Sequence, residues 1–184
     1  MADIKPKISL GLPVYNESEF LYETILSLEK QTYENIEIIA IDNGSDDDSY
    51  EKLEKYSQGD KRIKIFKNDE NIGLSNNFNL IFKKSTGKYF VWIGAHDRYN
   101  RNFVEELLKT ITSSKNISLV FSNVSNIDKN SQTINHKKNT GFQLLNNNSL
   151  LRLLKLPWMI RGSGDIVMGM FDSEILKKTT LFSD

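Results

Sequence analysis

Short apolar runs alternate along the chain with segments of helical periodicity. The apolar runs are rich in β-branched residues, and their length predicts strands over residues 8–12, 36–41, 63–66, 89–93, 118–123 and 166–171. Between them, the spacing of apolar positions predicts helices over residues 16–28, 48–56, 75–82, 102–111, 150–154 and 173–178. This alternation predicts an α/β fold, in which a mostly parallel sheet carries helices on both faces.

Local signals refine the ends of these elements. Asn16 followed by Glu19 has the pattern of a capping box and predicts the start of the first helix. Ser75 has the same role for the helix that ends before Gly87. Residues 126–148 are rich in Asn, Lys, Ser and Gln and predict an exposed hairpin or loop.

Composition narrows the class of protein. The chain has 184 residues, which suits a single domain over residues 1–184. Lys+Arg and Asp+Glu balance at 24 each, so no global charge favours a nucleic acid as partner. The absence of cysteine excludes disulfides and thiolate metal sites, and no apolar run approaches the roughly 20 residues of a membrane span. We therefore expect a cytoplasmic protein without a membrane span in this chain.

Polar side chains follow three of the predicted strands. Glu17 comes shortly after the first strand, Asp42 ends the second and Asp97 follows the fourth. Right-handed crossovers place these three strand ends on one edge of the sheet. Open parallel sheets bind their ligands at that edge, which predicts a nucleotide-type site.

Asp42 precedes a turn in which Gly44 can take a positive φ and bring backbone amides close to a ligand. A carboxylate there can accept a hydrogen bond from a base-ring N–H. Alternatively, Asp42 only caps the turn, as Asp commonly does. The run of residues 46–48 is read as a solvated helix N-terminus and not as a metal cluster.

Asp97 is the candidate metal ligand, because Mg²⁺ and Mn²⁺ prefer carboxylate oxygens. If the segment is extended, His96 points to the opposite side, where it packs or hydrogen-bonds beside Trp92. Asn71 and Gly73 lead into a helix whose N-terminus could receive a phosphate, although this pattern is also that of a simple turn and cap.

Four motifs occur in an order that resembles the N-terminal half of a family 2 glycosyltransferase of the inverting GT-A type. They are residues 12–17, 41–45, 71–73 and 87–97, and the resemblance extends over about residues 7–124. It implies a nucleotide-diphosphate sugar as donor, such as a UDP-sugar, and Mn²⁺ or Mg²⁺ as cofactor. It also implies a glycan or lipid-linked acceptor in surface polysaccharide synthesis.

The resemblance assigns roles to particular positions. Asp42 would bind the base and Asp97 the metal. The other residues implied to bind the nucleotide sugar are Pro13, Val14, Tyr15, Glu17, Asn71, Gly73 and His96. Two positions depart from the family pattern: Ala95 replaces the first Asp of the metal motif, and Phe78 stands where many relatives carry Arg.

The catalytic base of such enzymes is a later carboxylate, which we expect beyond Asp184, with Asp165 as the weaker candidate within the chain. The chain would then be a truncated, donor-binding part of a protein that reaches the inner face of the membrane through a further C-terminal part. The competing hypothesis is a non-catalytic nucleotide-sugar-binding module or inactive remnant. A dinucleotide-binding domain is disfavoured, because no G-x-G-x-x-G follows the first strand.

Overall fold

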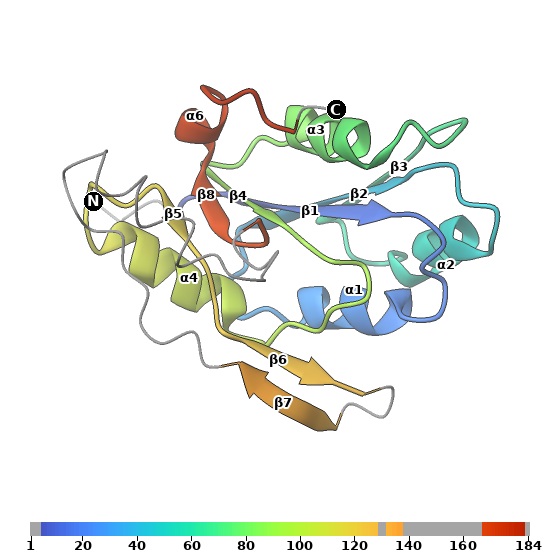
Figure 1. Ribbon diagram of the computed structural model, residues 1–184, viewed down its shortest axis with the longest axis horizontal. Helices are drawn as coiled ribbons and strands as arrows, with labels where there is room; N and C mark the ends of the chain where they lie inside the picture. Colours follow the sequence, from blue (N-terminus) through green and yellow to red (C-terminus); the bar gives the residue numbers. More distant parts are fainter. Residues whose placement is uncertain (1–4, 129–131, 138–166, 183–184) are drawn as a thin grey trace.

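A six-stranded sheet forms the centre of the molecule in the computed structural model, which describes residues 5–128, 132–137 and 167–182 (Figure 1). Its strands are β1 (Ile8–Val14), β2 (Ile36–Asp42), β3 (Ile63–Lys67), β4 (Tyr89–Trp92), β5 (Leu119–Val120) and β8 (Met170–Asp172), in the order β3-β2-β1-β4-β8-β5. The first four are parallel, whereas β8 is antiparallel to both of its neighbours. The predicted mostly parallel α/β sheet is confirmed.

Helices cover both faces of the sheet because its central strands are apolar on both sides (Figure 1). In β2, Ile38 and Ala40 face one cluster of buried side chains, and Ile39 and Ile41 face the other. The first cluster is closed by α1 (Leu21–Glu29), α2 (Ser49–Tyr56) and α4 (Phe103–Thr112). The second is closed by α3 (Leu74–Lys84) and α6 (Ser173–Leu176).

The C-terminal strands are shorter than predicted. The strand expected over residues 118–123 is only Leu119–Val120, because β5 pairs solely with the short β8. Residues 167–169 of the strand expected over 166–171 form a turn and a bend instead. The polar segment after β5 contains the predicted hairpin, formed by β6 (Val124–Ile127) and β7 (Thr133–Lys137) in a separate two-stranded sheet.

The two predicted helix caps are wrong. Helix α1 begins at Leu21 without a side-chain cap, and Asn16 adopts φ 55° so that its Oδ1 accepts from the Asp46 amide at 3.1 Å. Helix α3 begins at Leu74, one residue before the expected cap, and its N-cap is Gly73. The Asn16 side chain thus binds the turn after β2, and Gly73 takes the N-cap position that was expected for Ser75.

None of the helices in the described ranges has the length and apolar character needed to cross a membrane. The helix predicted over residues 150–154 and the candidate base Asp165 lie outside the described residues.

Glu37 is buried near the amino-terminal edge of the sheet, within β2. Its Oε1 accepts from the Ser9 hydroxyl at 2.6 Å and from the Thr86 amide at 2.7 Å. Its Oε2 lies 2.8 Å from Lys7 Nζ and 2.9 Å from Lys64 Nζ. Every carboxylate oxygen therefore has partners, and the group joins β1, β2, β3 and the segment before β4.

Candidate functional site

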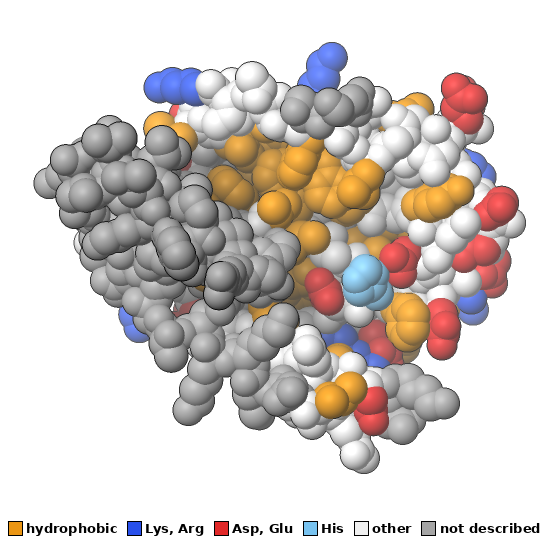
Figure 2. Space-filling model, in the orientation of Figure 1, with side chains coloured by type: hydrophobic (Ala, Val, Ile, Leu, Met, Phe, Trp, Pro, Cys, Tyr) orange, Lys and Arg blue, Asp and Glu red, His pale blue; other side chains and the backbone are white. Residues whose placement is uncertain are grey.

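The carboxyl ends of β2, β1 and β4 meet at one edge, since these strands are parallel neighbours. Val14 and Asp42 pair directly at the ends of β1 and β2. Figure 2 shows one face of the molecule, on which acidic side chains flank a histidine beside a broad apolar area. This face thus presents charged groups next to apolar side chains.

Asp42 ends β2 and is completely buried. Its Oδ2 accepts from the Ser45 amide at 3.1 Å, so it does cap the turn. Its Oδ1 is also buried but finds no hydrogen-bond donor within the described part of the chain. An unpaired buried acceptor costs free energy, so a hydrogen-bond donor that reached this oxygen would remove that cost.

Asn43, the next residue, joins the turn after β2 to the loop before α3. Its Nδ2 donates to Asn71 Oδ1 at 2.8 Å, and its Oδ1 accepts from Asn68 Nδ2 at 2.9 Å and from the Ile72 amide at 3.2 Å. Asn71 Oδ1 also accepts from the Gly73 amide at 2.9 Å. The segments of Asp42 and Gly73 are therefore held together. Asn43 was not among the predicted site residues, and only its place in an Asn-Gly turn could have indicated it.

The loop after β1 is fastened to the start of α2. The Asn16 amide donates to Ser45 Oγ at 3.0 Å, and the Glu17 amide donates to Ser49 Oγ at 2.8 Å. Tyr15 remains 44% exposed beside this junction. An aromatic face is thus presented to solvent next to the Asp42 turn.

Two predicted residues at the end of β1 are less accessible. Val14 is fully buried, and its side chain packs in the apolar core cluster. Its carbonyl accepts from the Asn43 amide at 2.8 Å, which fixes the two strand ends together. Pro13 is half-buried.

The segment after β4 turns back and is not extended, because the Asp97 amide donates to the Gly94 carbonyl at 3.1 Å. His96 consequently reaches the loop after β1, where its Nδ1 lies 3.0 Å from Glu17 Oε1. Trp92 is buried in the cluster beneath α3. The expected position of His96 beside Trp92 is therefore wrong. His96 does form a side-chain contact, and its partner is Glu17.

Asp97 presents an exposed carboxylate at this edge, the type of ligand that Mg²⁺ and Mn²⁺ prefer. Ala95 is buried and adds no oxygen from its side chain. Over the described ranges, no group of three or more His, Cys, Asp or Glu residues could hold a metal ion. The residues fit a cation that takes one carboxylate from the protein and its other ligands from a diphosphate and water.

Helix α3 starts beside the Asp42 turn. Gly73 has φ 85°, a conformation that favours glycine, and it is exposed at the helix N-terminus. Further along, Phe78 is buried and its ring contacts those of Trp92 and Phe182. The position of the family's Arg is thus part of the core and faces away from solvent.

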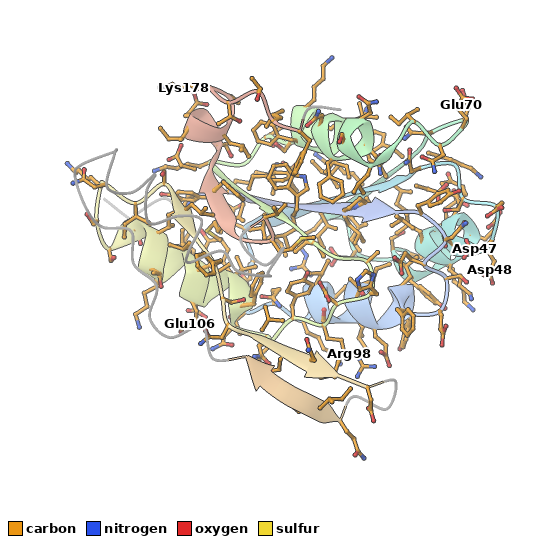
Figure 3. All side chains as sticks on the ribbon, in the orientation of Figure 1. Asp47, Asp48, Glu70, Arg98, Glu106 and Lys178 are labelled. Carbon is orange, nitrogen blue, oxygen red and sulfur yellow. The ribbon has the colours of Figure 1, made fainter. Side chains whose placement is uncertain are left out.

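The acidic run after β2 serves the local backbone. Asp47 Oδ1 accepts from the Ser49 amide at 2.9 Å, and Asp48 lies 2.9 Å from Lys52 in an i, i+4 ion pair. Both lie at the start of α2 (Figure 3). Their predicted role as a helix N-terminus is confirmed.

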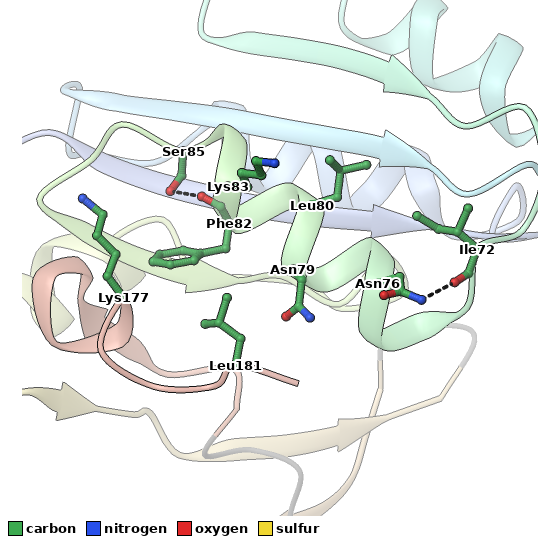
Figure 4. A pocket seen from close by; sticks show the side chains of 9 residues that line it. All are labelled: Ile72, Asn76, Asn79, Leu80, Phe82, Lys83, Ser85, Lys177 and Leu181. Carbon is green, nitrogen blue, oxygen red and sulfur yellow. Dashed lines mark hydrogen bonds between the residues drawn. The ribbon is translucent and has the colours of Figure 1, made fainter. Parts of the chain in front are cut away.

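A surface hollow of about 690 Å³ lies elsewhere, between α3 and the segment after α6 (Figure 4). Its walls include Leu80, Phe82 and Leu181, with Lys83 and Lys177 at the margin. None of the predicted site residues lines it, so the candidate site is defined by the strand ends and not by this hollow.

Several known proteins resemble this chain in sequence. Similar proteins include an uncharacterized glycosyltransferase of Haemophilus influenzae, 36% identical over 61% of this chain and 35% of that relative. Glycosyltransferase GlyG of Streptococcus pneumoniae is 30% identical over 66% of this chain and 40% of that relative. The chain thus spans well under half the length of either protein.

Solved structures show the same fold. The TarS fragment 1–349 of S. aureus in complex with UDP-GlcNAc has a TM-score of 0.70 at 18% identity, over 93% of this chain and 46% of that one. The mannosyltransferase PcManGT of Pyrobaculum calidifontis, in complex with GDP-Man and Mn²⁺, has a TM-score of 0.61 at 19% identity, over 67% and 37%. These likenesses confirm the GT-A-type fold.

The model of the family described as Glycosyl transferase family 2 matches residues 9–175, which include all the strand ends of the candidate site. The chain therefore belongs to glycosyl transferase family 2.

Proposed function

We propose that this chain binds a nucleotide-diphosphate sugar, of which a UDP-sugar is the best match, at the carboxyl edge of its sheet. The whole protein would transfer that sugar with inversion to a glycan or lipid-linked acceptor in the cytoplasm, in surface polysaccharide synthesis. Family membership supports the transferase chemistry, and TarS and PcManGT support a nucleotide sugar as donor.

The buried, unpaired Oδ1 of Asp42 is the observation that carries the proposal. Uracil and thymine have an N3–H that can donate to such an oxygen. A hydrogen bond from this N–H would remove the free-energy cost of leaving Asp42 Oδ1 unpaired, which favours the nucleotide-bound state. Tyr15, exposed at the neighbouring strand end, would provide a ring face for the base.

The diphosphate would lie between the start of α3 and the turn that carries Asp97. Gly73 leaves the helix N-terminus open, where the amide groups and the helix dipole attract anions. Asp97 would hold Mn²⁺ or Mg²⁺, and such an ion neutralises the charge on the departing nucleoside diphosphate. The His96–Glu17 contact would keep this turn next to the nucleoside loop.

Transfer requires a base as well as a donor site. A carboxylate takes the proton of the acceptor hydroxyl while its oxygen forms a bond to the anomeric carbon. The bond from that carbon to the diphosphate breaks, and the nucleoside diphosphate leaves with the electron pair from the opposite side of the sugar. Asp165 is the candidate base within the sequence, and it lies outside the described residues.

Substitution of Asp42 tests the donor site. Asp42→Ala should weaken UDP binding by about 1–3 kcal/mol, the scale of a hydrogen bond to a charged group. Isothermal titration calorimetry of the folded proteins measures this difference.

Asp48→Ala is the matched control, because it removes a solvent-facing carboxylate from the same segment. It should bind UDP as the wild type does. Equal UDP affinity in the folded Asp42→Ala protein would remove Asp42 from the site.

The alternative is a non-catalytic nucleotide-sugar-binding module. Two observations favour it: Ala95 supplies no carboxylate, and Phe78, an uncharged residue packed in the core, supplies no cation. Release of nucleoside diphosphate by the whole protein, measured with donor, Mn²⁺ and a glycan or lipid extract, separates the two functions. Turnover supports the transferase, and binding without turnover supports the module.

A further inference from the structure

The turn that carries Asp97 is anchored to helix α1. Thr24 Oγ1, on the buried side of that helix, lies 2.8 Å from the Ala95 carbonyl and 2.9 Å from the Asp97 carbonyl. The Tyr99 amide donates to Ser27 Oγ at 3.2 Å, one turn further along α1. The backbone on both sides of the Asp97 carboxylate is therefore fixed to a rigid element.

The hydroxyl of Tyr99 lies between the Gly94 amide and the Asp97 carboxylate. It accepts from the Gly94 N–H at 2.9 Å, and it lies 3.4 Å from Asp97 Oδ2. The Tyr99 hydroxyl has a single proton to donate. Because its oxygen already accepts from the Gly94 N–H, this proton is directed to Asp97 Oδ2.

The same carboxylate oxygen folds over the backbone of Gly94. A Cβ at this glycine would lie only 2.3 Å from Asp97 Oδ2. Glycine is thus required for the present position of the carboxylate. Both contacts involve Oδ2, and they leave Oδ1 for a ligand.

We propose that Tyr99 is a positioning residue for the cation of the donor complex: its hydroxyl holds Asp97 Oδ2 against the Gly94 turn and so presents Oδ1 to a diphosphate-bound divalent ion. This inference rests on the assignment of Asp97 in the proposed function. The orientation of Asp97 matters because no cluster of three or more His, Cys, Asp or Glu residues in the described part of the chain could hold the ion.

Tyr99→Phe tests the inference, since it removes the hydroxyl and retains the ring that packs against Phe103. Mn²⁺ affinity, measured by electron paramagnetic resonance with saturating UDP, should fall on the order of 10-fold, the usual effect of losing a partner of a metal ligand. The affinity for UDP without Mn²⁺ should stay unchanged. A purely structural role for the hydroxyl would not separate these two affinities.

Tyr33→Phe is the matched control. Tyr33 is a buried tyrosine whose hydroxyl donates to the Pro6 carbonyl at 2.6 Å, near the opposite edge of the sheet. Its loss should leave Mn²⁺ affinity at the wild-type value, even if the unfolding temperature drops.

Gly94→Ala provides a second variant in case Tyr99→Phe does not fold. The new methyl group would displace the Asp97 carboxylate while the Tyr99 hydroxyl remains, so Mn²⁺ affinity should again fall. Wild-type Mn²⁺ affinity in the folded Tyr99→Phe protein, with a loss in Asp97→Asn, would overturn the role of Tyr99 alone. Wild-type Mn²⁺ affinity in Asp97→Asn would overturn the cation site itself. UDP binding at Asp42 is tested separately, by the Asp42→Ala substitution.

Discussion

Two buried carboxylates in strand β2 differ in their hydrogen bonding, and the difference separates a structural role from a binding role. Glu37 has partners on both oxygens, whereas Asp42 keeps one oxygen unpaired. The sequence shows both simply as acidic residues in an apolar strand. Asp42 could be singled out because a turn follows it, but the partners of Glu37 come from distant segments and could not be predicted.

Glu37 should make stability depend on pH. Burial alone would raise the pKa of Glu37, but hydrogen bonds from Lys7, Ser9, Lys64 and Thr86 outweigh it and hold that pKa well below its ordinary value of 4.5. A lowered pKa in the folded state stabilises the protein above pH 4.5, and this contribution is lost as the pH falls below that value. Glu37→Gln should therefore cost about 1–3 kcal/mol at pH 7 and less in acid. Urea denaturation from pH 7 to pH 3 measures the change.

Glu174→Gln is the control for this prediction. Glu174 is an exposed carboxylate paired with Lys177 on α6, so its removal should leave the free energy of unfolding nearly unchanged at every pH. Parallel stability curves for the wild type and Glu37→Gln across this pH range would contradict the role assigned to Glu37.

At the scale of elements, the sequence predicted the strands and helices of the first half and the edge at which they meet. Apolar runs and helical periodicity carry that information locally. The cap at Asn16 failed because its side chain bonds to the turn after β2, which a local pattern does not reveal. The cap at Ser75 failed because α3 already begins at Leu74. The lengths of β5 and β8 depend on their mutual pairing and on no signal within either segment.

The turn after β2 should be sensitive to a single methyl group. Gly44 has φ 72°, and a Cβ there would lie 2.6 Å from the carbonyl carbon of Glu70. Gly44→Ala should cost about 1–3 kcal/mol from backbone strain alone, with the collision in addition. Because the turn carries Asn43 and Asp42, UDP affinity should fall as well. Chemical denaturation and calorimetry measure the two effects.

Gly59→Ala separates strain from collision. Gly59 also has a positive φ, of 101°, but no atom lies within 4 Å of its Cβ position. It should lose stability from strain only and keep its UDP affinity. If Gly44→Ala lost no more stability than Gly59→Ala and bound UDP normally, the packing of the two loops would not support the site.

At the scale of the whole molecule, the site is assembled from loops that follow three adjacent strands, together with the start of α3. The sequence predicted through topology that Glu17, Asp42 and Asp97 share one edge of the sheet. It could not place hydrogen bonds such as those of Asn43 with Asn71 and of the Tyr99 amide with Ser27, because these join residues far apart in the chain. The carboxyl edge of the sheet could thus be predicted as the place of the candidate site. The contacts that hold its loops in place became known only from the structure.

The position of bound UDP tests the central claim most directly. Amide chemical shifts of the ¹⁵N-labelled chain, recorded during titration with UDP, should change most at Tyr15, Ser45 and Gly73, at the carboxyl edge. Added Mn²⁺ should then broaden the amides around Asp97 first. Shift changes centred on Glu37 and Thr86 at the opposite edge, or on Asn79 and Ser85 along the hollow beside α3, would contradict a nucleotide site at the strand ends.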